Sequence, residues 1–159
     1  ASTCADESKD SLDWLKTSAF AGRQTDYSGV FVYQSDDRVE SSRIIHVLEE
    51  DGEFERIERL DGPNREIVRH HGQVWSYLDH KLMQLDVDHA QSRFPDFLPE
   101  RLAMLENNYR PKILGGDRVA GYDTQVVLFR PKDNLRYSHK IWVHHDSGLL
   151  LKSAVLDDK

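Results

Sequence analysis

Cysteine is almost absent from this chain of 159 residues, since Cys4 is the only one. A single thiol cannot form an internal disulfide, so cysteine usage neither requires nor excludes an oxidising compartment. We interpret Cys4 as an incidental thiol near a polar terminus. A signal peptide is not visible either, because Ala1 is followed by neither a charged nor an apolar segment. We therefore expect a mature or a shortened form of the protein.

Long apolar runs are missing too, and no stretch approaches the ~20 consecutive apolar residues that a transmembrane helix needs. With 38% hydrophobic and 31% charged residues, the chain is predicted to form one domain with a polar surface and no membrane span. Acidic residues outnumber basic ones by 28 to 21, which gives a net charge of −7. This balance argues against a nucleic-acid partner, because phosphate contacts require a basic face.

Catalytic motifs are absent from the sequence. It contains no G-x-S-x-G, no P-loop and no dinucleotide fingerprint. A hydrolase needs a nucleophile beside a base, or a carboxylate pair, and the acidic residues here are scattered over segments that look solvated. We predict no catalytic residue and no cofactor. An enzyme whose site is assembled from distant residues stays an alternative.

Metal-ligand spacings are also missing, although the chain has eight histidines. Neither HExxH nor a paired Cys-His spacing occurs. The neighbours His70 and His71, like His144 and His145, are expected to point to opposite faces of a strand. The sequence therefore predicts no metal site.

Turn-forming residues are plentiful in the stretch from Leu60 to Leu85 and divide it into three short strands. The turns are predicted at Asp61-Gly62-Pro63, His71-Gly72 and Asp79-His80-Lys81. In the middle strand Trp75 and Tyr77 share one face, while aliphatic residues occupy the other. A sheet that is apolar on both faces lies inside a sandwich or curls around other elements.

The remaining sequence adds further strands and two helices. Alternating apolar residues predict strands at residues 27–34, 38–49, 53–60, 112–114, 118–122, 124–130, 137–144 and 149–156, with a turn at 115–117 between two of them. The charged strand at 53–60 is expected to face opposite charges across the sheet. Residues 1–8 are expected to be disordered, and a first helix starts at Asp10 or Ser11. A second helix follows Pro99, with Leu102, Leu105 and Tyr109 along one side.

Consecutive strands joined by tight turns predict a mainly β, antiparallel α+β protein. Two helices cannot wrap such a sheet, but they can fill the concave side of a curved one. We therefore predict that residues 9–159 form a single domain, a curved half-barrel sheet that encloses both helices. The pattern alone also allows a closed barrel or a sandwich.

Several segments resemble, in order and spacing, the N-terminal domain of the MucB/RseB family of periplasmic regulators of the envelope-stress sigma factor. The segments are residues 29–33, 60–63, 65–69 with Gly72, 118–121, 136–138, 146–149 and 151–152. One departure is Leu150, where the family usually has proline. The resemblance implies a half-barrel similar to the lipoprotein-carrier and lipid-binding fold. It also implies an export signal that has been removed, and a further strand and second domain beyond Lys159.

The same resemblance implies a function without catalysis. The domain would bind the periplasmic part of a membrane-anchored anti-sigma factor and protect it from proteolysis, until lipid or lipopolysaccharide acyl chains release it. A periplasmic lipid or lipoprotein carrier without a regulatory partner is the second hypothesis.

Aromatic residues on strands are the candidate ligand-binding groups, because they offer large apolar area with a polar handle. Any one of them can equally be a core residue. As a set they would line a cavity for acyl chains, with the second helix and the loop before it as a lid. The candidates are Phe31, Tyr33, Trp75, Tyr77, Phe94, Phe97, Leu102, Phe129 and Trp142.

Overall fold

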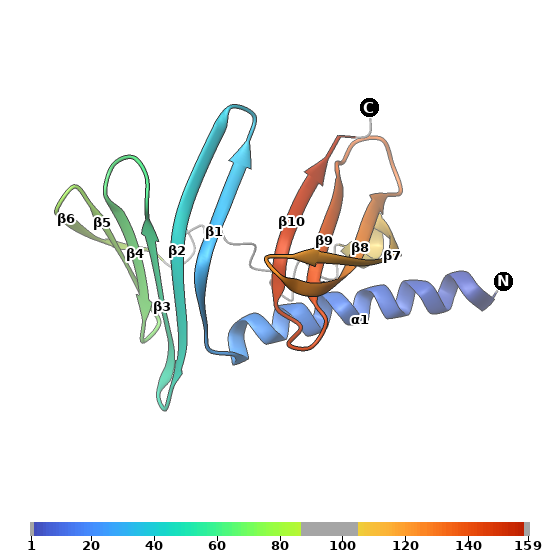
Figure 1. Ribbon diagram of the computed structural model, residues 1–159, viewed down its shortest axis with the longest axis horizontal. Coiled ribbons are helices and arrows are strands. Elements are labelled where there is room, and N and C mark those ends of the chain that lie inside the picture. Colours follow the sequence, from blue (N-terminus) through green and yellow to red (C-terminus); the bar gives the residue numbers. More distant parts are fainter. Residues whose placement is uncertain (1, 87–104, 158–159) are drawn as a thin grey trace. The chain divides into compact units, whose positions relative to one another are not determined.

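The computed structural model describes residues 2–86 and 105–157 of the chain (Figure 1). These residues fall into two compact units, and each is described by itself. Residues 24–94 contain strands β1 to β6, and residues 1–23 with 95–159 contain helix α1 and strands β7 to β10. We call them the six-stranded unit and the four-stranded unit.

The six-stranded unit is an antiparallel meander in which each strand pairs with the next along the chain. Its turns are local and their residues explain them. Gly52, Gly62 and the pair His71-Gly72 have positive φ, where glycine has no steric cost. The strands are β1 (Tyr27–Ser35), β2 (Arg38–Glu49), β3 (Gly52–Arg59), β4 (Arg65–His70), β5 (Gln73–Leu78) and β6 (Lys81–Leu85).

The two faces of this sheet differ in burial. Directly paired residues share a face, so Phe31, Ser42 and Arg59 lie on one face in a row across β1, β2 and β3. The same face carries the buried Ile44 and Val74. The opposite face carries the exposed side chains Val30, Val32, Val39 and Leu82.

Charged side chains also pair across strands, as the sequence predicted. On the more exposed face, Arg56 of β3 donates from Nε to Oε1 of Glu66 on β4 over 2.6 Å. This contact raises the pKa of Arg56. On the other face, Arg69 Nε lies 3.4 Å from Glu55 Oε1.

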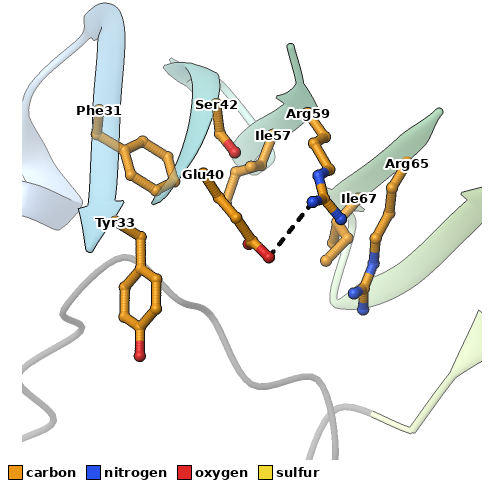
Figure 2. A pocket seen from close by; sticks show the side chains of 8 residues that line it. All are labelled: Phe31, Tyr33, Glu40, Ser42, Ile57, Arg59, Arg65 and Ile67. Carbon is orange, nitrogen blue, oxygen red and sulfur yellow. Dashed lines mark ion pairs between the residues drawn. The ribbon is translucent and has the colours of Figure 1, made fainter. Parts of the chain in front are cut away.

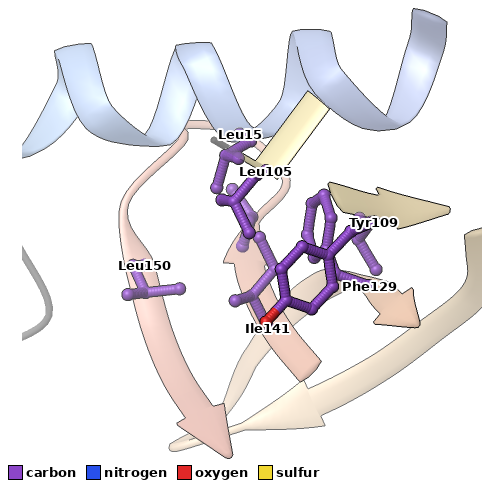
Figure 3. Close-up of a cluster of buried hydrophobic side chains, with 8 residues drawn as sticks. Leu15, Leu105, Tyr109, Phe129, Ile141 and Leu150 are labelled. Atoms are coloured by element: carbon purple, nitrogen blue, oxygen red, sulfur yellow. The ribbon is translucent and has the colours of Figure 1, made fainter. Parts of the chain in front are cut away.

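The four-stranded unit packs helix α1 (Ser2–Gln24) on an antiparallel sheet of order β10-β9-β8-β7. Its buried apolar cluster joins Leu15 of the helix to residues of all four strands (Figure 3). The strands are β7 (Tyr109–Val119), β8 (Tyr122–Pro131), β9 (Ser138–His144) and β10 (Leu150–Leu156). The cluster consists of Leu15, Leu105, Tyr109, Val127, Phe129, Ile141, Val143 and Leu150, with Trp14 packed against it.

Gly148, in the turn between β9 and β10, allows α1 to approach this sheet. Its φ is +76°, and a Cβ atom there would lie 2.8 Å from Cγ2 of Thr17 on the helix. Glycine therefore serves both the turn conformation and the close approach of the helix.

The mainly β, antiparallel class is confirmed, but four details differ from the prediction. The described strands pair in two sheets, of six and four strands, rather than in one. Helix α1 begins at Ser2, so residues 2–8, which we expected to be disordered, are helical. Residues 105–108 are helical, but Tyr109 already belongs to β7, and the residues before 105 that we predicted to begin the second helix lie outside the described residues.

The fourth difference is the predicted turn at 115–117, which is a bulge inside the continuous strand β7. The register with β8 shifts between Ile113 and Gly115, and Gly115 has φ +103°. The true turn lies at Ala120 and Gly121, both with positive φ. In the described parts of the chain, no helix is long and apolar enough to cross a membrane. The single domain at residues 9–159 stays a prediction.

Candidate functional site

A pocket lies on the more buried face of the six-stranded unit, over strands β1 to β4 (Figure 2). Each strand contributes two alternate residues, as the two-residue period of a strand requires. Because the strands are in register, Phe31 lies opposite Ser42, Tyr33 opposite Glu40, and Ile57 opposite Ile67. The lining residues are Phe31, Tyr33, Glu40, Ser42, Ile57, Arg59, Arg65 and Ile67.

The polar side of the pocket is an ion-pair network around Glu40. This side chain is only 8% exposed, and its Oε1 lies 3.4 Å from Nη2 of Arg59 and 3.9 Å from Nη1 of Arg38. Asp61, in the turn after β3, accepts a hydrogen bond from the backbone N–H of Ser41 and lies 3.5 Å from Nε of Arg59. Asp61 thereby joins the turn to β2, and its contact with Arg59 holds that side chain at the rim of the pocket.

Of the two guanidinium groups in the pocket, Arg65 is the one with capacity for an anion. Arg59 is already engaged, because its Nη2 lies 3.4 Å from Glu40 Oε1 and its buried Nε lies 3.5 Å from Asp61 Oδ1. The exposed Arg65 guanidinium forms no ion pair with any described residue. With one carboxylate and two guanidinium groups, the lining carries a net positive charge, whereas Phe31 and Ile67 supply apolar wall. This combination suits an amphiphile with an anionic head.

The size of the pocket sets a limit on what the described walls alone can hold. The cavity measures about 50 Å³, and pockets that enclose drug-sized ligands measure roughly 300–1,000 Å³. These residues can therefore seat a head group or the first carbons of a chain, but not a whole acyl chain.

Within the six-stranded unit, the predicted ligand-binding residues do not share one face of the sheet. Phe31 and Tyr33 line the pocket. Trp75 and Tyr77 pair with Val68 and Glu66, which places them on the opposite face of the same sheet. The expectation that all the aromatics face one interior is therefore wrong for these two residues. Both faces of β5 carry apolar groups, so alternation could not tell which face is covered.

Two further candidates lie in the four-stranded unit. Phe129 is 1% exposed and packs in the cluster with Leu15, so it is a core residue. Trp142 points to the other face of β9, where its ring lies 4.4 Å from Nζ of Lys152 and its Nε1 donates to Oδ2 of Asp117 over 2.9 Å. That hydrogen bond lowers the pKa of the Asp117 carboxyl. The candidates Phe94, Phe97 and Leu102 lie outside the described residues.

Sequence reasoning missed the charged half of the pocket, formed by Glu40, Arg59 and Arg65. The available signal was the spacing of Glu40 and Ser42 on a strand that also contains Ile44, which places all three on one face. Charged residues on strands are usually solvated, so this signal did not distinguish a pocket from a surface.

The fold and the pocket define an open antiparallel-sheet protein with a small amphiphilic site on one sheet face. Residues 10–159 match the MucB/RseB N-terminal domain. The chain belongs to the MucB/RseB family. A curated relative, the sigma factor AlgU regulatory protein MucB of Pseudomonas aeruginosa, is 34% identical over 156 residues, which are 98% of this chain and 48% of the relative.

Solved structures agree with this assignment. The complex of MucA and MucB from Pseudomonas aeruginosa matches with a TM-score of 0.74 at 31% identity, over 94% of this chain and 52% of that chain. The lipoprotein LppX of Mycobacterium tuberculosis matches with a TM-score of 0.54 at 11% identity, over 92% of this chain and 87% of LppX, and shares the fold alone. The chain spans about half the length of the curated relatives it matches.

Proposed function

We propose that this chain is the ligand-sensing part of a non-enzymatic periplasmic regulator of the envelope-stress sigma factor. It binds the periplasmic part of a membrane-anchored anti-sigma factor, shields that protein from proteolysis, and is released by lipid or lipopolysaccharide. Family membership and the names of the relatives as sigma-factor regulatory proteins support the regulatory role. A MucB relative solved together with MucA supports the protein partner.

The pocket on β1 to β4 is the observation that carries the ligand part of the proposal. An anionic head group would contact Arg65, and its first methylenes would pack on Phe31 and Ile67. Each buried methylene contributes about 0.8 kcal/mol. Glu40 lies at ion-pair distance from the guanidinium groups of Arg59 and Arg38, so its charge is offset inside the pocket.

The ligand test is a calorimetric titration of the chain with a lysophospholipid that has an anionic head group, below its micelle concentration. We expect binding that Arg65→Gln and Phe31→Ala weaken. The matched controls are Arg43→Gln and Val32→Ala, which change the same kind of residue on the opposite face of the sheet and should leave binding unchanged. Equal effects of the pocket and control variants would contradict the pocket assignment.

The partner test uses a peptide that covers the periplasmic part of the anti-sigma factor. The regulatory proposal expects capture of the peptide by the chain, and loss of capture when the lysophospholipid is added to wild type but not to Arg65→Gln. Lipid binding without any capture of the peptide would favour the carrier hypothesis. If the chain captures the peptide and lipid does not change this capture, the pocket does not control release of the partner.

A further inference from the structure

A cluster of metal-ligand side chains lies at one end of the six-stranded unit, away from the pocket. Nε2 of His70, the last residue of β4, lies 2.8 Å from Oε2 of Glu49 at the end of β2. The ring centroids of His70 and His71 are 3.7 Å apart. One ligand atom from each of these three residues lies within 4.8 Å of the others.

Backbone conformation explains how two adjacent histidines come together. Residues that are adjacent in a strand point to opposite faces, and for this reason the sequence predicts no metal site. His71, however, has φ +50° in the turn between β4 and β5, so the alternation stops at His70. Glu49 lies opposite Gly52 and His70 lies opposite Phe54, so Glu49 and His70 are diagonal neighbours across β3 on one face of the sheet.

The surroundings of the cluster also favour a cation. Asp51 Oδ2 lies 3.4 Å from Nδ1 of His71, and the hairpin between β2 and β3 carries acidic residues at 49, 50, 51 and 53. The Phe54 ring packs edge-on against His70 at a centroid distance of 5.5 Å, which restricts the imidazole. Carboxylates near a ligand imidazole raise its basicity and fix its orientation.

We propose that Glu49, His70 and His71, with Asp51 beside them, bind a divalent transition-metal ion of the zinc type. Imidazole and carboxylate are suitable ligands for zinc, and ligand atoms around a tetrahedral zinc ion lie roughly 3.3 Å apart. Among the three ligands, Nε2 of His70 and Oε2 of Glu49 are 2.8 Å apart, and all three ligand atoms lie within 4.8 Å of one another, so modest side-chain rotations reach this spacing. Three protein ligands leave a coordination position for water, which suits a partly exposed site. The ion would join the β2–β3 hairpin to the β4–β5 turn.

The test is a calorimetric titration with zinc chloride in a buffer that does not chelate, using the chain with Cys4→Ser so that no thiol competes. We expect one zinc ion per chain. His71→Asn and Glu49→Gln should each weaken binding by at least about tenfold. Asparagine tolerates positive φ, so the turn at position 71 should persist, and thermal melting without zinc checks this. Zinc should also raise the melting temperature of the parent chain but not of His71→Asn.

His80→Asn is the matched control. His80 also has positive φ (+69°) in a turn, but this turn follows β5, at the other end of that strand (Figure 1). Its zinc affinity should equal that of the parent chain. The proposal is overturned if no stoichiometric zinc binding occurs, if His71→Asn binds zinc like the parent, or if His80→Asn weakens binding as much as His71→Asn does. Imidazole NMR signals of His70 and His71 should shift with zinc while that of His80 stays in place.

Discussion

Gly148→Ala tests the packing of helix α1 against the turn between β9 and β10. The substitution adds two costs. A φ of +76° costs an L-residue about 1–2 kcal/mol. Alanine also lowers the conformational entropy of the unfolded chain, which offsets roughly 0.4–1 kcal/mol of this cost. The new methyl group also meets Thr17 Cγ2 at 2.8 Å, and overpacking of this kind costs about 1–3 kcal/mol. We expect a loss of about 2–4 kcal/mol of unfolding free energy.

Gly121→Ala separates the two costs. Gly121 has φ +85° in the same unit, but its nearest neighbour is the end of the Arg118 side chain at 4.0 Å. It should therefore lose only the backbone part, roughly 0.5–1 kcal/mol. Thr17→Ser removes Cγ2. In the double variant with Gly148→Ala it should recover the stability lost to overpacking, and alone it should change the unfolding free energy little.

Urea unfolding followed by tryptophan fluorescence is the assay. A Trp75→Phe background leaves Trp14 and Trp142, which both lie in the four-stranded unit, so the signal reports on that unit. Equal midpoints for Gly148→Ala and Gly121→Ala, or no recovery with Thr17→Ser, would refute the argument that this glycine allows the helix to approach the sheet.

Two further predictions concern a turn and a buried histidine. Gly62→Val should lower the unfolding free energy by about 1–3 kcal/mol, because Gly62 has φ +71° and its Cβ would lie 3.1 Å from Nη2 of Arg59. Gly29→Val, in open space within β1, is the control, and equal urea midpoints for the two variants would contradict this prediction. Burial lowers the pKa of His139, so the unfolded chain binds the proton more readily and stability should fall as pH drops below about 6.5. His139→Gln should reduce this fall in urea midpoints between pH 8 and pH 5, and an unchanged pH dependence would show that His139 is not its source.

Local turn chemistry made much of the strand order predictable. Asp51-Gly52, Asp61-Gly62 and His71-Gly72 each end a strand, as the sequence indicated, because glycine with positive φ is a local requirement of tight turns. Gly115-Gly116 carries the same signal but forms a bulge. Glycine with positive φ serves turns and bulges alike, and only the pairing with β8 distinguishes them.

Alternation predicted which residues share a face, but not which face is covered. Trp75 and Tyr77 share a face as expected, yet they lie opposite the pocket. The covered face is set by contacts with elements distant in sequence, and β5 is apolar on both sides. Conversely, the pocket places Tyr33, Glu40, Arg59 and Arg65 together because three consecutive hairpins hold their strands in register. No single segment of the sequence contains that information.

The pocket and the histidine cluster are separable by position, and this decides how their tests combine. Glu49 is an odd number of residues from Glu40 and Ser42 along β2, so its side chain points to the other face of the sheet. The cluster therefore lies on the opposite face from the pocket. The hairpin at Glu49 and the turn at Asp61 lie at opposite ends of β3, whose eight residues span roughly 26 Å. Binding at one site changes affinity at the other only if the sheet has two states that the two ligands prefer differently. The two sites share no residue and lie on opposite faces, so we expect them to be independent. His71→Asn should leave lysophospholipid binding intact, and Arg65→Gln should leave zinc binding intact. Failure of one proposal would not weaken the other.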